Sequence, residues 1–109
     1  MHKPLLLFLA IISSAAVAAP PDAPQLYAAH CAGCHGADRL GAVGPALLPE
    51  NLARLRQSEA VKVIASGRAA SQMPGFADKL KDDQIQALAT LIYTPLPAVP
   101  VWGEAEMRT

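Results

Sequence analysis

The chain has 109 residues, with nine basic and nine acidic side chains and a formal net charge of zero. This length suits one domain, and the absence of a polybasic run argues against binding to nucleic acid or to an anionic membrane surface. Because only 5% of the residues are aromatic, so short a chain makes a marginal core, and we expect another group to fill its centre.

Residues 1–18 have the order of a secretory signal peptide. After a short basic start, an apolar run extends from Leu5 to Ile12, and small residues follow, ending in Ala16-Val17-Ala18. The run is shorter than the roughly 20 apolar residues that span a bilayer, which argues against an uncleaved anchor. We therefore expect cleavage after Ala18, a periplasmic location and no membrane span in the mature chain.

The rest of the chain predicts an all-α domain over residues 19–94 and a proline-rich, extended tail over 95–109. Apolar residues recur at helical spacing, Gly and Pro mark the loops, and no segment alternates as a strand would. Asp22 is the expected N-cap of the first helix. The predicted elements are, in chain order, a helix at about 23–33, a loop at 36–48, a short helix at 49–56, a helix capped by Ser58 with Glu59 and stopped by Gly67, a loop at 68–81, and a last helix that begins at Asp82-Asp83 and ends at Thr94-Pro95.

The segment Cys31-Ala32-Gly33-Cys34-His35 carries the strongest chemical signal. C-x-x-C-H is the pattern of covalent c-type haem attachment. Two thiols three residues apart lie on one side of a helical turn, where both reach the haem vinyl groups. His35 follows directly, and imidazole is a standard axial ligand of haem iron.

Three alternative roles for this segment are less favourable. A zinc site needs four ligands, and the mature chain has no second Cys/His pair. A thioredoxin-like redox pair needs a βαβ context, which the sequence lacks. A disulfide between Cys31 and Cys34 would close a very small loop and stabilise little.

The sixth iron ligand has several candidates. Met73 lies in a loop and precedes Pro74, which keeps the backbone extended. By spacing alone, a role of Met73 in core packing is equally favoured. His30 is on the same helix as His35 and does not easily reach the opposite face of the ring, and Met107 is in the tail.

Several segments taken together are more specific than any one of them. They are Leu26-Tyr27, His30-Cys31-Ala32-Gly33-Cys34-His35-Gly36, Gly44-Pro45-Ala46-Leu47, Met73-Pro74-Gly75-Phe76 and Ile85-Gln86-Ala87-Leu88 with Ile92-Tyr93. This set resembles the class I c-type cytochromes. The resemblance implies the cytochrome c fold, with about four short helices around one covalent haem c, and iron bound by His35 and Met73. It also implies that the first and last helices cross and that Gly44-Pro45 shapes the loop on the His35 side. Tyr27, Phe76 and Leu88 are expected either to lie near the ring or to be ordinary core residues, and the two roles are equally favoured.

A second group of segments resembles a narrower family. Ala37-Asp38-Arg39-Leu40-Gly41, Leu48-Pro49-Glu50-Asn51-Leu52 and Gln72-Met73-Pro74 are similar to the N-terminal cytochrome domain of dihydro-haem d dehydrogenases, the nitrite-reductase-like proteins of denitrifying bacteria. In that family a proline-rich linker, which the segment from Pro95 to Trp102 resembles, leads to a β-propeller. This sequence stops at Thr109 without a propeller.

These observations predict a monomeric periplasmic electron-transfer protein rather than an enzyme. Its partners would be redox proteins, among them a β-propeller protein that carries d-type haem, in denitrification or in d-type haem maturation. We expect Arg54 or Arg56 to pair with a haem propionate. The alternatives are an open-site haem protein that binds small ligands or reduces peroxide, a thiol–disulfide oxidoreductase, and a module that docks a separate propeller through its tail.

Overall fold

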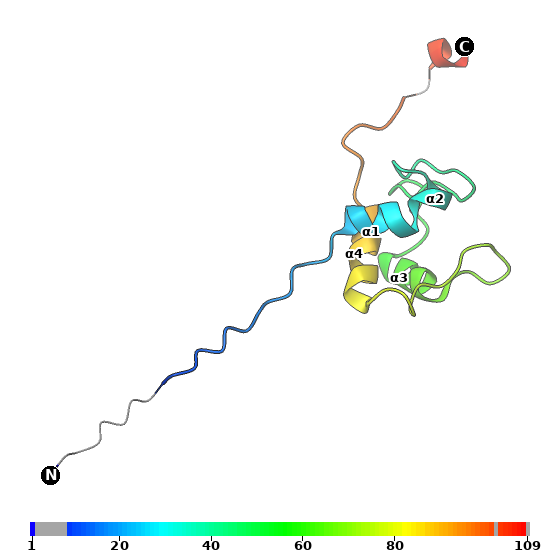
Figure 1. Ribbon diagram of the computed structural model, residues 1–109. Helices are drawn as coiled ribbons and strands as arrows, with labels where there is room; N and C mark the ends of the chain where they lie inside the picture. Colours follow the sequence, from blue (N-terminus) through cyan, green and yellow to red (C-terminus); the bar gives the residue numbers. More distant parts are fainter. Residues whose placement is uncertain (2–8, 102, 109) are drawn as a thin grey trace.

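The computed structural model describes residues 1, 9–101 and 103–108, and within these ranges every regular element is a helix. Trp102, Thr109 and the first half of the predicted signal-peptide apolar run, residues 5–8, lie outside the described residues. The all-α prediction is confirmed (Figure 1). The helices are α1 (Ala23–His30), α2 (Ala32–His35), α3 (Gln57–Ser66), α4 (Asp82–Ile92) and α5 (Glu104–Met107).

The predicted first helix is present but divides at Cys31 into α1 and α2. Asp22 caps α1 as expected, since its Oδ1 accepts a hydrogen bond from the Gln25 amide at 3.1 Å. The backbone is distorted at Cys31, with φ −119°. Hydrogen bonds continue across the break, because the Cys31 amide donates to the Tyr27 carbonyl at 2.8 Å and the His35 amide donates to the Cys31 carbonyl at 2.9 Å. The C-x-x-C-H segment therefore occupies one compact turn at the end of α1.

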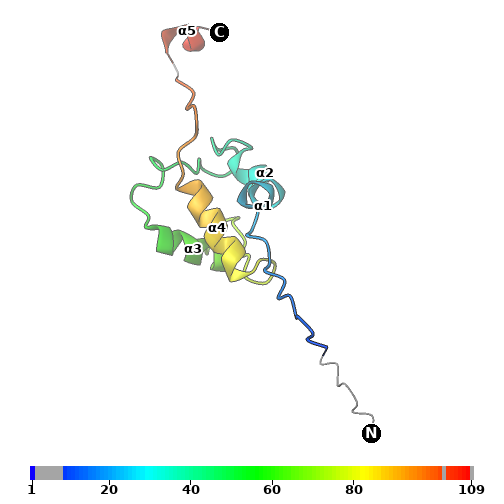
Figure 2. The ribbon, with the colours of Figure 1, turned by 90° about the vertical axis from the view of Figure 1, so that its left-hand side faces the viewer.

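Helix α4 is the centre of the core. Its predicted apolar face is buried and consists of Ile85, Leu88, Ala89 and Ile92. Both α1 and α3 pack against α4, so the predicted crossing of the first and last helices of the domain is observed (Figure 2). Tyr27 from α1 and Ala60 and Ile64 from α3 belong to the same buried cluster.

Two predictions about helices are wrong, namely the short helix at 49–56 and the N-cap of α3. Residues 49–56 form hydrogen-bonded turns instead of a helix. The Leu55 amide bonds to the Leu52 carbonyl three residues back, and no regular ladder develops, because a segment this short supports few helical hydrogen bonds. Ser58 is not the N-cap of α3, which begins one residue earlier after the extended backbone of Arg56.

The segments on either side of the helical domain extend away from it. Residues 9–22 have no regular structure, and the tail leaves the end of α4 in the opposite direction (Figures 1 and 2). Residues 95–101 have no helix or strand, and Glu104–Met107 form α5, one turn that the sequence did not predict. None of the helices in the described residues combines the length and apolar character needed to cross a bilayer.

Candidate functional site

All four predicted site residues line one cavity of about 720 Å³. Cys31, Cys34 and His35 contribute from the end of α1 and from α2, and Met73 contributes from the loop after α3. The apolar side chains on its wall are Val43, Pro45, Ala46, Leu47, Leu52, Leu55, Ala60, Val63, Ile64, Pro74, Phe76, Leu88 and Ile92. Residues far apart in the sequence thus meet at one largely apolar site.

The imidazole of His35 is fixed by the loop that follows α2. Its Nδ1 lies 2.7 Å from the Pro45 carbonyl oxygen. A carbonyl can only accept a hydrogen bond, so Nδ1 carries a proton, and in the neutral imidazole the lone pair is then on Nε2. This tautomer is the one in which Nε2 can bind a metal while the other ring nitrogen is held in place.

Gly44 allows this loop to approach His35 closely, as expected for Gly44-Pro45. The Gly44 amide donates to the Cys34 carbonyl at 2.7 Å. A Cβ at this position would lie 3.0 Å from Cε1 of His35 and 3.1 Å from its Nδ1. A larger residue would therefore push the imidazole or the loop out of place.

The loop that carries Met73 is held at its base by the end of α3. The Phe76 amide donates to the Ile64 carbonyl at 2.9 Å, and the Arg68 amide donates to the Met73 carbonyl at 3.2 Å. Gly67, at φ +75°, ends α3, and a Cβ there would lie 2.7 Å from the Met73 carbonyl oxygen. The backbone on both sides of the Met73 loop thus fixes where its thioether enters the cavity.

The two thiols are not joined and differ in their surroundings. Cys31 is half-buried, and Cys34 is exposed. Burial, with a smaller contribution from the charge of Cys34, raises the pKa of the Cys31 thiol to about 11. A redox-active dithiol needs a lowered pKa, so this site lacks the electrostatics of a thiol–disulfide oxidoreductase.

The other candidate ligands lie differently. His30 is exposed on α1, with its ring edge-on to Phe76 at a centroid distance of 5.9 Å. It borders the cavity from the same end of α1 that leads to His35. Met107 is in α5, is 74% exposed and does not line the cavity.

Among the basic residues, Arg54 and Arg68 line the cavity and Arg56 does not. Arg56 is the N-cap residue of α3. Of the two arginines expected to pair with a propionate, only Arg54 therefore lines the cavity. Arg68 is a further candidate that the sequence did not predict. No spacing rule distinguishes these residues, because their distance from the cavity depends on loop conformation.

Of the three residues expected near the ring, Phe76 and Leu88 line the cavity but Tyr27 does not. Tyr27 is 3% exposed, and its hydroxyl donates to the Gly36 carbonyl at 2.8 Å. Burial is the main reason that the pKa of this hydroxyl rises to about 12. Tyr27 therefore ties α1 to the end of α2 and does not form the cavity wall.

The donor set of the cavity fits a covalently attached haem. A site of this size and apolar character is typical for a bound cofactor. Two thiols, an imidazole with its Nε2 free and a thioether are the groups that c-type haem attachment and axial ligation require.

Comparison with known proteins identifies the family. The family model described as "Cytochrome C oxidase, cbb3-type, subunit III" matches residues 18–92. A dihydro-heme d1 dehydrogenase from Pseudomonas aeruginosa is 46% identical over 95 residues, which are 85% of this chain and 19% of that protein. A cytochrome c55X from Paracoccus denitrificans is 31% identical and is aligned over 78% of this chain and 88% of its own length.

Solved structures of similar proteins have the same fold. That of the dihydro-heme d1 dehydrogenase NirN in complex with DHE matches with a TM-score of 0.72 and 46% identity, over 81% of this chain and 18% of that one. The c-type cytochrome NirC matches with a TM-score of 0.60 and 31% identity, over 64% of this chain and 82% of that one. The chain thus spans about a fifth of the first relative and most of the second.

Proposed function

Because the chain belongs to the c-type cytochrome family, whose members carry covalently attached haem c, we propose that it transfers single electrons through one haem. Cys31 and Cys34 form the thioether bonds, and His35 and Met73 bind the iron. The observation that carries this proposal is the meeting of these four residues at one apolar cavity, with the His35 tautomer set by the Pro45 carbonyl.

The bound haem supplies one-electron redox chemistry at iron, and the residues of the chain tune it. His35 presents Nε2, and its bond to Pro45 increases the basicity of the imidazole. Met73 presents a soft sulfur that favours the ferrous state. The buried side chains Leu52, Ile64 and Leu88 exclude water from the cavity wall.

We further propose that residues 1–18 are a signal peptide, that residues 19–94 form the cytochrome domain and that residues 95–109 act as a linker-like tail. This arrangement places the protein in the periplasm. Support comes from the sequence pattern of the first segment, from the family match over residues 18–92 and from the extended tail beyond α4.

The relatives suggest a pathway. Their names connect this type of domain with d1-type haem and with the cytochromes c55X. We propose that the chain acts as an electron donor or acceptor in d-type haem maturation or denitrification, with a β-propeller protein among its redox partners. In this role it is a carrier and performs no catalysis of its own.

Replacing Met73 with Ala tests the assignment. The variant should open the sixth iron position, lose the weak red absorption of an Fe(III)–Met bond, lower the midpoint potential and bind carbon monoxide rapidly when reduced. The parent should resist carbon monoxide at neutral pH. The measurements are visible spectra, redox titration and carbon monoxide binding rates.

Met107→Ala is the matched control, since this methionine is exposed on α5 and does not line the cavity. It should behave as the parent does. If the parent binds carbon monoxide as fast as the Met73 variant, Met73 is not a ligand, and the open-site haem protein becomes the better assignment.

A further inference from the structure

Arg39 combines a left-handed backbone with a buried, charged side chain. Its φ is +62°, in the region that favours glycine, and its side chain leaves the residue only 5% exposed. This backbone conformation is unfavourable for a residue that has a Cβ. Such an outlier is a reason to look for a role of the side chain.

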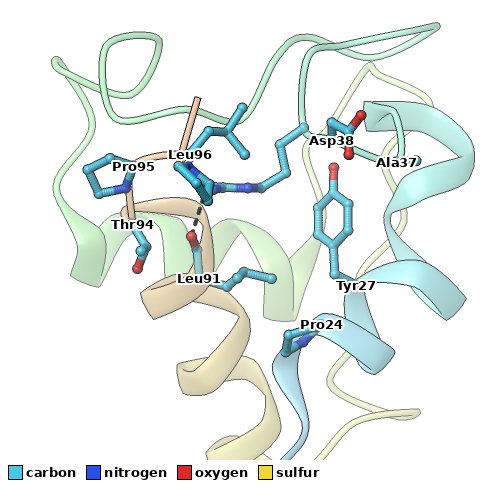
Figure 3. Close-up of a pocket in the computed structure, with 10 residues that line it drawn as sticks. Pro24, Tyr27, Ala37, Asp38, Leu91, Thr94, Pro95 and Leu96 are labelled. Carbon is cyan, nitrogen blue, oxygen red and sulfur yellow. Dashed lines mark hydrogen bonds between the residues drawn. The ribbon is translucent and has the colours of Figure 1, made fainter. Parts of the chain in front are cut away.

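The guanidinium of Arg39 joins two distant parts of the backbone. Its Nη1 donates to the Leu47 carbonyl at 3.2 Å and to the Leu91 carbonyl at 2.9 Å; the second bond is the dashed line that ends at Leu91 in Figure 3. The Leu47 amide donates back to the Arg39 carbonyl at 2.9 Å. Both backbone polar groups of Leu47 are therefore bound to Arg39, which closes the loop from 39 to 47.

The charge of Arg39 is balanced by a helix end. Among the ion pairs of the described residues, none involves Arg39. Leu91 is in the last turn of α4, where carbonyls without helical partners carry partial negative charge. Since α4 is the centre of the core, this bond fixes the loop to a rigid part of the molecule.

The closed loop contains the group that holds His35. Pro45, whose carbonyl accepts the His35 Nδ1 proton, lies two residues before Leu47. Only Ala46 lies between Pro45 and Leu47, so a displacement of Leu47 should also move the Pro45 carbonyl. The orientation of His35 thus depends in part on the bond from Arg39 to Leu91, and these two residues line a second pocket between α1, the end of α4 and the start of the tail (Figure 3).

We propose that Arg39 is a positioning residue for the iron ligand: it anchors the 39–47 loop to the end of α4 and so fixes the Pro45 carbonyl that orients His35. This inference rests on the proposed function, in which His35 binds iron. A firmly held carbonyl strengthens electron donation by the imidazole and stabilises ferric iron. Loosening the loop should therefore raise the midpoint potential.

Arg39→Gly separates the side chain from the backbone strain, because glycine accepts the positive φ while the guanidinium is removed. In the haem-loaded protein we expect the His35 Nδ1 proton to exchange with solvent at least tenfold faster, measured by NMR of the reduced form. The midpoint potential should rise. Arg39→Lys, which keeps the charge but not the planar fork, should give intermediate values of both.

Two controls separate positioning from stability. Ala70→Gly replaces an exposed residue at φ +58° in the loop before Met73, and it should leave proton exchange and potential unchanged. Ile85→Val removes a methyl group from a buried core residue that does not line the cavity; it should lower the stability and leave proton exchange and potential unchanged.

The proposal is overturned if Arg39→Gly keeps the parental exchange rate and midpoint potential. It is also overturned if Ile85→Val changes the exchange rate and the potential as much as Arg39→Gly does. Should the glycine variant not fold, parental values in Arg39→Lys overturn it equally. A parent without covalent haem, or a His35→Ala variant that keeps the parental spectrum, would instead refute the proposed function.

Discussion

Single polar side chains hold the backbone together around the cavity. Tyr27, His35 and Arg39 each donate to a main-chain carbonyl, at 2.8, 2.7 and 2.9 Å respectively. Each such hydrogen bond contributes about 0.5–1.5 kcal/mol to the stability of the folded state. Removing the donor also leaves a buried carbonyl oxygen without a hydrogen bond, which is destabilising. These three contacts connect the C-x-x-C-H turn and its following loop to the rest of the fold.

Tyr27→Phe tests one of these contacts through its pH dependence. At pH 7 the variant should be less stable by about 0.5–1.5 kcal/mol, because the bond to Gly36 is lost. The pKa of Tyr27 is about 12 in the folded protein and about 10 in the unfolded chain. The phenol therefore ionises first in the unfolded state, and the parent loses stability as the pH rises from 10 to 12.

By pH 11 the earlier ionisation of Tyr27 in the unfolded chain should lower the free energy of unfolding of the parent by about 1 kcal/mol. The variant has no phenol at this position, so its free energy of unfolding should not change through this effect. Denaturant unfolding at pH 7 and pH 11 would measure the stability gap between them, which should shrink or reverse. A gap of constant size across this range would contradict the burial of the Tyr27 hydroxyl.

At the scale of elements, two loops with no regular structure carry the proposed iron ligation. The loop after α2 holds His35 through Pro45, and the loop after α3 carries Met73. Each is fixed by close backbone approaches at glycine, Gly44 in the first and Gly67 in the second. The helices provide the rigid frame, and the loops set the geometry of the site.

Gly67→Ala tests the base of the second loop. A Cβ would lie 2.7 Å from backbone atoms of Met73 and Gly75, and the positive φ adds strain of about 1–3 kcal/mol. We expect a lower unfolding temperature and partial loss of the Fe(III)–Met absorption. Gly33→Ala is the matched control, because a Cβ there meets no atom within 4 Å; equal effects of the two substitutions would refute the proposed role of Gly67 at the base of the loop.

At the scale of the whole molecule, the cavity occupies much of the space that a core would fill. The cavity has a volume of about 720 Å³, and the described residues bury only ten apolar side chains in total. Deleting a single buried leucine typically costs about 3–5 kcal/mol, and a whole domain has a stability of only about 5–15 kcal/mol. The attached haem should therefore supply a large share of the folding free energy.

The double variant Cys31→Ala/Cys34→Ala removes both attachment points, and alanine preserves the helical propensity of this segment. We expect it to be largely unfolded at room temperature, with weak helical circular dichroism and no cooperative thermal transition. The parent, which should keep its haem through acid–acetone extraction, is the reference. A double variant that melts cooperatively near the temperature of the parent would show that the protein core suffices alone.

The sequence by itself determined what depends on neighbours along the chain. Cys34 and His35 follow Cys31 by three and four residues, so one helical turn brings the three side chains together whatever the remaining fold. The apolar face of α4 and the cap at Asp22 also follow from local periodicity and local hydrogen bonds. The resemblance of several short segments to class I cytochromes then indicated the fold.

Only the tertiary structure decided the features that depend on contacts between distant segments. Among them are the Pro45 carbonyl at His35, the closely packed base of the Met73 loop, and the burial of Arg39 against the end of α4. The turns at 49–56 and the break at Cys31 belong here too, because packing overrides weak local preferences in short helices. Spacing rules describe one element at a time, whereas these contacts form only when the elements have packed together.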